Sequence, residues 1–338
     1  MTTFILGYRT ALAYWSARKS SALHRPLSPS EEMCVLAEAA TPSKEQVMRI
    51  IEAQLFSGIE APLDLISTKR SASLRTSYMR VHGQLSPLPP GSITFAGSIS
   101  GDEDELSVFV STPELCLVQM GCFAERHELA ELAFELCGDY ALRPDGMGGT
   151  HIIKRQHATT ADSLRAYIAR AADVHGVKRA RFAAECVVDS SRSPRESQIA
   201  LEMTLSYRLG GYGLPRPKLN EKITLEGAAR RAAGVREIYP DFYWPNEGLV
   251  LEYDSDAFHS DSAKRERDIR KRNAYEMLGL HALSLTHRQF TDQLQFACIM
   301  EEVGRMLGYK THALTAIQQR KRAQLHGFLT HGSRLPRL

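Results

Sequence analysis

The stretch Ile238-Tyr-Pro-Asp-Phe-Tyr-Trp-Pro-Asn-Glu-Gly-Leu-Val-Leu-Glu-Tyr-Asp-Ser-Asp-Ala-Phe-His259 decides how the second half of the chain folds. It contains two runs rich in aromatic and branched apolar residues, 238–244 and 249–253. The segment between them, 245–248, reads Pro-Asn-Glu-Gly, a composition typical of a tight turn. Two such runs joined by a short turn predict a β-hairpin.

Both predicted strands of this hairpin carry carboxylates. Glu252 and Asp254 are two residues apart on the second strand, so they point to the same face. Asp241, on the first strand, can reach the same end of the sheet, and His259 lies just beyond. Three carboxylates are costly to bury together unless a positive charge lies among them, and Mg²⁺ prefers hard oxygen ligands of this kind. We therefore expect a Mg²⁺ (or Mn²⁺) site at Asp241, Glu252 and Asp254, with His259 as a general acid or base.

Helices and further strands are expected on both sides of the hairpin. The predicted order is a helix over 195–209, a strand over 221–225, the hairpin, a charged helix over 261–278, a strand over 281–286 and a helix over 289–307. Helices that alternate with strands in this way predict an α/β fold with a mixed sheet. Glu196 lies in the first turn of the leading helix, where it either complements the helix dipole or adds a carboxylate to the metal site.

The predicted helix over 261–278 is rich in basic residues, among them Arg267, Arg270, Lys271 and Arg272. In most proteins such residues form a solvated face, whereas beside a carboxylate cluster they can hold the phosphodiester backbone of DNA. Asp268 and Arg272 have the spacing of an i,i+4 ion pair on a helix.

The chain of 338 residues is long enough for two domains. Serines and arginines before Pro194 place a boundary there, which gives an α+β domain over 1–189 and an α/β domain over 190–308. Residues 309–338 are basic and carry few apolar anchors, so a loosely attached basic tail is expected.

The pattern of the first half is less regular. Residues 4–18 and 114–138 have helical periodicity, and short β-like runs lie between 63 and 110, separated by clusters of Pro, Gly and Asp. The polar, glycine-rich segment 139–157 predicts a loop.

Composition and charge limit the classes of protein that fit. The 42 Lys and Arg residues against 39 Asp and Glu give a net charge of +3, which is too small to imply a polyanion partner by itself. The six cysteines include no Cys-x-x-Cys pair, so the ligand spacing of a zinc site is absent. Because no apolar run is long enough to cross a bilayer and the N-terminus has no cleavable signal pattern, a cytoplasmic location without membrane contact is expected.

The order of these residues resembles the restriction-endonuclease-like (PD-(D/E)XK) superfamily. The likeness consists of Glu196 on a leading helix, Asp241 on a hairpin strand, Leu-Glu-Tyr-Asp at 251–254, His259, and the pattern Asp268-x-x-x-Arg272. It covers about residues 190–290, and the very-short-patch-repair (Vsr) endonucleases look like the most similar branch.

Two positions depart from the pattern of that family. The superfamily usually has a lysine two residues after the acidic strand residue, and here Asp254 takes that place. Vsr-like members also lack this lysine and use a histidine. Ser255 stands where the Vsr-like branch usually has glycine.

The resemblance implies a Mg²⁺-dependent endodeoxyribonuclease in repair or defence, with a mixed sheet flanked by helices. It makes Asp241 the central metal ligand, helped by Glu252 or Asp254. It makes His259 the acid or base, and Glu196 a carboxylate outside the direct ligands.

The first half is similar, more weakly, to the central part of AbiEi-like antitoxin and transcriptional-regulator proteins. The similarity lies in Tyr8-Arg-Thr-Ala-Leu12, Val81-His82 and Val110-Ser-Thr-Pro113. It implies an alternative function, in which a catalytically inactive nuclease fold binds DNA, or a protein partner such as a cognate toxin. A third possibility is a structural protein whose carboxylates form only salt bridges.

Overall fold

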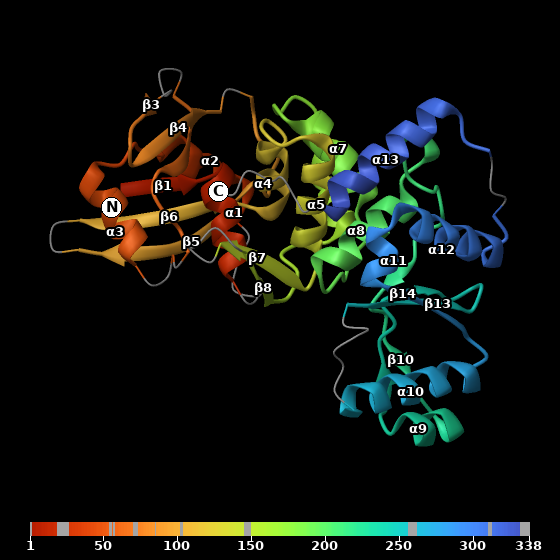
Figure 1. Cartoon of the computed structure of the whole chain (residues 1–338). Helices are drawn as coiled ribbons and strands as arrows, with labels where there is room; N and C mark the ends of the chain where they lie inside the picture. The colour runs from red at the N-terminus through yellow and green to blue at the C-terminus, as the bar shows by residue number, and fades with distance from the viewer. Residues whose placement is uncertain are drawn as a thin grey trace. The chain divides into compact units, whose positions relative to one another are not determined.

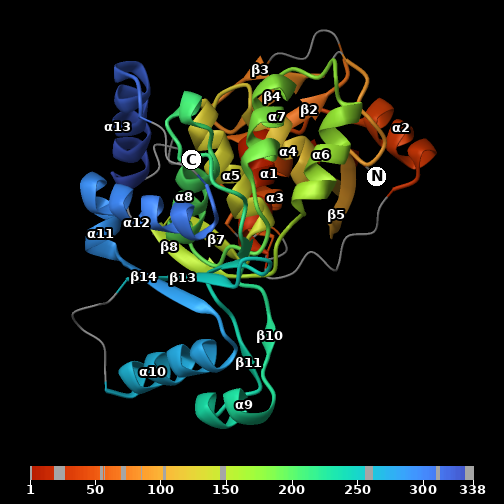
Figure 2. The same cartoon turned by 90° about the vertical axis from the view of Figure 1, so that its right-hand side faces the viewer.

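The computed structural model describes residues 2–18, 27–53, 56, 58–69, 74–84, 86–101, 104–144, 150–255, 262–309 and 313–331 (Figures 1 and 2). The chain divides into two compact units between Val187 and Val188, near the expected boundary at 189/190. Both units combine helices and sheets, so the protein is of the mixed α/β class. In this described part of the chain, no helix is long and apolar enough to cross a membrane.

The first unit is built on a six-stranded sheet of order β3-β4-β2-β1-β6-β5. Its strands are β1 (Thr2–Leu6), β2 (Leu63–Ser67), β3 (Leu74–Arg75), β4 (Met79–Gly83), β5 (Ile93–Ser100) and β6 (Glu105–Ser111). Strand β1 pairs in parallel with β6 and antiparallel with β2, and its residues Phe4 to Leu6 are fully enclosed. The prediction of a helix from residue 4 is therefore wrong at its start, because the helix begins only at Tyr8.

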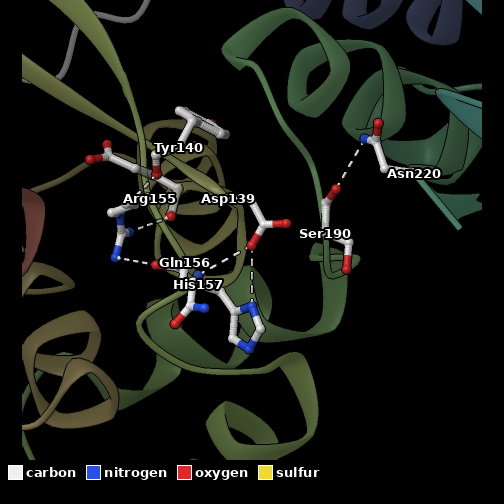
Figure 3. Close-up of polar contacts among 8 residues, drawn as sticks. Asp139, Tyr140, Arg155, Gln156, His157, Ser190 and Asn220 are labelled. Atoms are coloured by element: carbon white, nitrogen blue, oxygen red, sulfur yellow. Dashed lines mark hydrogen bonds and ion pairs between the residues drawn. The ribbon is translucent and has the colours of Figure 1, made fainter. Parts of the chain in front are cut away.

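The helices of the first unit are α1 (Tyr8–Ala17), α2 (Pro29–Glu38), α3 (Lys44–Glu52), α4 (Pro113–Met120), α5 (Arg126–Cys137), α6 (Ala161–Arg170) and α7 (Val177–Cys186). The segment 139–157, expected to be a loop, instead contains a hairpin of β7 (Tyr140–Pro144) and β8 (Thr150–Lys154). Arg155 secures it: Nε donates to the carbonyl of Tyr140 at 2.9 Å, and Nη2 donates to the carbonyl of Glu135 at 2.7 Å (Figure 3).

The second unit contains a four-stranded mixed sheet of order β14-β13-β12-β9. The strands are β9 (Lys218–Leu219), β12 (Phe242–Trp244), β13 (Leu249–Asp254) and β14 (His281–Thr286). The predicted hairpin is confirmed: β12 pairs antiparallel with β13, and Trp244 faces Leu249 across the turn. Strand β12 is also antiparallel to β9, whereas β13 and β14 are parallel. Parallel neighbours need a crossover, and α10 (Ser262–Met277) provides it.

Apart from an insertion over residues 223–238, the chain order helix, three strands, helix, strand is present, beginning with α8 (Pro194–Thr204). Its first strand is β9, not the predicted 221–225, because a strand of two residues directly after Pro215 and Pro217 shows no β pattern in the sequence. The predicted segment contributes β10 (Ile223–Thr224), which pairs with β11 (Glu237–Ile238) in a separate ribbon. The helix α9 (Gly227–Ala233) joins these two strands and packs against α10 (Figure 1).

The C-terminal segment differs from the expected loose tail, because residues 316–330 form the helix α13 (Ala316–Thr330). Its residues Leu325 and Leu329 are fully enclosed. His326 Nδ1 hydrogen-bonds the buried carboxylate of Glu202 on α8, at 3.2 Å. Arg195 Nη1, at the start of α8, donates to the carbonyl of Leu329 at 3.2 Å. The polar and basic run 318–322 concealed this contact with α8, because the apolar residues that pack follow only at the end of the helix. The remaining elements of the unit are the 3₁₀ helix η2 (Tyr207–Leu209), α11 (His287–Thr291) and α12 (Gln293–Met306).

Leu329→Ala is expected to lower the free energy of unfolding of the second unit by about 2–4 kcal/mol, because it opens a cavity at a side chain with 0% exposure. The matched control on the same helix is Ile317→Ala, since Ile317 is 68% exposed and its truncation costs about 0.5 kcal/mol or less. Urea unfolding measures both variants. Equal, small effects would mean that α13 is detached from the unit.

Candidate active site

Glu196 is fixed at the start of α8 by hydrogen bonds to both carboxylate oxygens. Ser193, the N-cap residue, accepts the backbone N–H of Glu196 and donates its hydroxyl to Oε1 at 2.8 Å. Oε2 accepts the backbone N–H of Arg192 at 2.9 Å and the side-chain amide of Asn220 at 2.6 Å. Burial of the side chain raises the pKa of Glu196. Glu196 therefore complements the helix terminus and also reaches toward the sheet.

Asn220 connects Glu196 to the strand that carries Asp241. Besides Glu196, its side-chain amide contacts the carbonyl of Ser190 at 3.0 Å (Figure 3). Its backbone N–H donates to the carbonyl of Asp241 at 3.3 Å. The backbone of Asn220 has a φ of 48°, in the left-handed region that asparagine tolerates better than most residues. This residue thus fixes the distance between α8 and the start of β12.

Asp241 lies immediately before β12, and its surroundings raise its pKa strongly. Its Oδ2 accepts the backbone N–H of Tyr253 at 2.7 Å, and Oδ1 receives no hydrogen bond from any described residue. Burial, followed by the carboxylates of Glu252 and Glu196, raises the pKa of Asp241 to about 8. The carboxylates of Glu196 on α8 and Glu252 on β13 thus both act electrostatically on Asp241. The sequence predicted this proximity for Asp241 and Glu252.

Glu252 on β13 is engaged by two side chains of α10. Lys271 Nζ lies 2.9 Å from Glu252 Oε2 and also donates to the carbonyl of Tyr239 at 2.8 Å. The hydroxyl of Tyr275, one helical turn later, donates to Glu252 Oε1. Burial and the neighbouring Glu252 carboxylate raise the pKa of Tyr275, so this phenol keeps its proton at neutral pH. Lys271 was expected to contact DNA, but its side chain is half-buried and its ammonium contacts the carboxylate of Glu252.

The other basic residues expected to contact DNA, Arg267, Arg270 and Arg272, lie on the exposed side of α10. Arg270 forms an i,i+4 ion pair with Glu266. The predicted pair of Asp268 with Arg272 is not among the ion pairs of the described residues; Arg272 Nη2 donates to Ser284 Oγ at 3.2 Å instead.

Of the two remaining predicted site residues, the structure describes one. Asp254 is the last residue of β13, opposite Thr286 of β14, and is half-buried. His259 lies outside the described residues, so its predicted role as acid or base stays a prediction.

Arg192 is a basic residue of the site that the sequence did not single out. Its backbone N–H donates to Glu196, and its guanidinium lies 4.6 Å from the ring centroid of Tyr239. The side chain is exposed, and none of the described residues forms an ion pair with its guanidinium. An arginine that makes a cation–π contact with an aromatic ring beside a carboxylate cluster is well placed to bind a phosphate.

No set of three or more His, Cys, Asp or Glu side chains in the described ranges is arranged as a ready metal site. One reason is that Lys271 and Tyr275 occupy both oxygens of Glu252. The donor chemistry nevertheless fits a hard cation. Asp241 has one oxygen without a donor among the described residues. Burial, and after it the neighbouring carboxylates of Glu252 and Glu196, raise the pKa of Asp241, so the ionised form would be stabilised by a bound cation.

Comparisons of the chain with protein-family models, with curated proteins and with solved structures each gave no match.

Proposed function

We propose that the second unit is a divalent-cation-dependent hydrolase of DNA phosphodiester bonds, of the restriction-endonuclease-like type. The observation that carries the proposal is the electrostatic convergence of Glu196, Asp241 and Glu252, with the Lys271 ammonium on one of them. The mixed sheet supports it, because the resemblance in the sequence implied such a sheet. Apart from the insertion over residues 223–238, the chain order helix, three strands, helix, strand also agrees with the order predicted from the sequence.

Lys271 supplies, from another element, the positive charge that the superfamily pattern places on the strand. The lysine of the superfamily is replaced by Asp254 on the strand, whereas Lys271 brings an ammonium to Glu252 from α10. A lysine at this place neutralises part of the carboxylate charge in the resting state. During hydrolysis it would stabilise the negative charge that develops on the phosphate.

Asp241 and Glu252 are the residues that would hold Mg²⁺ or Mn²⁺ in this proposal, with Asp254 as a further candidate ligand. The bound cation would activate a water molecule and stabilise charge on the phosphate. Asp241 holds a proton at neutral pH and must release it to become a ligand. Glu196 and Asn220 keep the Asp241 backbone in place, and Arg192 would bind a phosphate oxygen.

Incubation of supercoiled plasmid with the full-length protein and Mg²⁺ or Mn²⁺ tests the proposal. Nicked or linear DNA that no longer forms in EDTA is the expected result. Intact plasmid with both cations would contradict hydrolysis.

A second candidate function is DNA binding without hydrolysis, as in an antitoxin or regulator. The engagement of both Glu252 oxygens by Lys271 and Tyr275 favours it, because such contacts close a ligand position. In that case DNA binding is sensitive to salt and unchanged by EDTA, and the plasmid stays intact.

Arg192→Ala is expected to weaken binding of a short DNA duplex by about three- to tenfold, because one phosphate contact is lost. The difference from the wild type should shrink as the salt concentration rises. Fluorescence anisotropy with Ca²⁺ in place of Mg²⁺ measures binding, and the control is Arg231→Ala, an exposed arginine on α9. Equal affinities of the two variants would exclude Arg192 from the DNA contact.

A further inference from the structure

A cavity of about 220 Å³ lies in the second unit and shares no lining residue with the carboxylate cluster. Its walls come from η2 and the segment after it, from α12, from α13 and from the segment between these two helices. They include Tyr207, Tyr212, Leu214, Met300, Leu314 and Arg322. We propose that this cavity binds a small aromatic carboxylate, a ligand that is independent of the proposed hydrolysis of DNA.

Arg322 provides a cation with unused hydrogen-bonding capacity. Its guanidinium lies 3.9 Å from the ring centroid of Tyr212 and 5.7 Å from that of Tyr207, so it makes cation–π contacts with two tyrosine rings. Nη2 donates to the carbonyl of Gly211 at 3.1 Å, whereas the enclosed Nε has no acceptor among the described residues. A buried donor of this kind costs stability unless an acceptor arrives.

Tyr212 provides a second unsatisfied hydrogen-bond donor in addition to Arg322 Nε. The residue is 4% exposed, and its enclosed hydroxyl has no hydrogen-bond partner in the described part of the chain. Burial raises the pKa of Tyr212, so the hydroxyl keeps its proton and remains a donor at neutral pH. Tyr212 and Arg322 thus line one cavity and each carries an unsatisfied donor, and two such donors fit the two oxygens of a carboxylate. Because both are enclosed, a small shift of the Arg322 side chain must accompany binding.

The remaining lining residues favour a ligand with an aromatic ring and a single negative charge. Leu214, Met300 and Leu314 are apolar and the tyrosines are flat, which suits an aromatic ring. Glu301 also lines the cavity, and its exposed carboxylate repels a dianion such as phosphate more strongly than a monoanion.

The probe for this site is 4-fluorobenzoate, followed by ¹⁹F NMR with the full-length protein. We expect its signal to broaden and shift saturably, and the signals of 4-fluorobenzamide and 4-fluorobenzylamine to stay sharp. Arg322→Lys should weaken binding about tenfold, because an ammonium does not reproduce the guanidinium edge. The matched control is Arg320→Lys, an exposed arginine on the same helix, with unchanged binding.

Tyr212→Phe separates a binding role from a structural one. It removes only the hydroxyl, so the ligand-free variant should unfold at the same or a higher urea concentration than the wild type. Its affinity for 4-fluorobenzoate should nevertheless fall about three- to tenfold. Any of three results would overturn the inference: no saturable binding by the folded wild type, equal binding of the amide, or equal affinities of wild type, Arg322→Lys and Tyr212→Phe.

Discussion

Asp241→Asn is expected to reduce cation-dependent cleavage by about a hundredfold or more and, at the same time, to stabilise the cation-free protein. Cleavage falls because an amide is a poor ligand for Mg²⁺ and carries no charge. Stability rises by about 1–3 kcal/mol at alkaline pH, because the variant no longer has to ionise a desolvated carboxyl beside Glu252 and Glu196.

The dependence of this effect on pH follows from the direction of the shift. The pKa of Asp241 rises from 3.8 to about 8 on folding, so between these values the folded chain holds a proton that the unfolded chain has released. The contribution of Asp241 to stability is therefore complete below about pH 4 and is lost as the pH rises toward about 8. The stability difference between Asp241→Asn and the wild type should widen over this window and then level off.

Urea unfolding in EDTA at several pH values measures this difference, and plasmid cleavage with Mg²⁺ or Mn²⁺ measures the activity. Asp268→Asn is the matched control, since Asp268 is exposed on α10. Wild-type cleavage by Asp241→Asn, or a variant that is less stable than the wild type at alkaline pH, would contradict the assignment of Asp241.

Lys271→Met is expected to lower the free energy of unfolding by about 2 kcal/mol and to remove cleavage. The substitution keeps much of the side-chain volume but removes the ammonium that contacts Glu252 and the carbonyl of Tyr239. Glu252 is then left beside Asp241 without this compensating cation. Because the side chains of Lys271 and Glu252 are 28% and 23% exposed, solvent reduces the loss below that of a fully buried pair.

Two comparisons identify the cause of the Lys271 effect. Arg270→Met, on the same helix, breaks only an exposed ion pair with Glu266 and should cost about 0.5 kcal/mol or less. Combining Lys271→Met with Glu252→Gln should recover part of the lost stability, because the two residues interact directly. If Lys271→Met leaves stability unchanged and weakens only DNA binding, Lys271 is a DNA contact, as its place in a basic helix first indicated.

The hairpin was predictable from the sequence because local chemistry determines it. The segment Pro-Asn-Glu-Gly places glycine at position 248, where φ is 59°, and the flanking runs are strongly β-forming. Residues two apart on a strand point to the same face, and this alternation also predicted that Glu252 lies on the side of the sheet that Asp241 reaches.

The inward orientation of Lys271 could not be predicted in the same way. The helix α10 is highly charged, and among its described side chains Ala274 and Tyr275 are the buried ones. They pack against Val250 of the sheet and against apolar residues of the β10–α9–β11 segment. Asn220 and Arg192 enter the site through tertiary contacts that no spacing in the sequence reveals. The buried strand β1 was hidden for a different reason, because a short apolar run next to a helical pattern is ambiguous.

The central claim is that Asp241 and Glu252 hold a divalent cation, and calorimetric titration of Mn²⁺ into the full-length protein tests it most directly. Saturable binding at a single site is expected, with release of close to one proton at neutral pH as Asp241 ionises. Asp241→Asn should show neither the binding nor the proton release. Failure of the folded wild-type protein to bind Mn²⁺, or equal binding by wild type and Asp241→Asn, would contradict the claim.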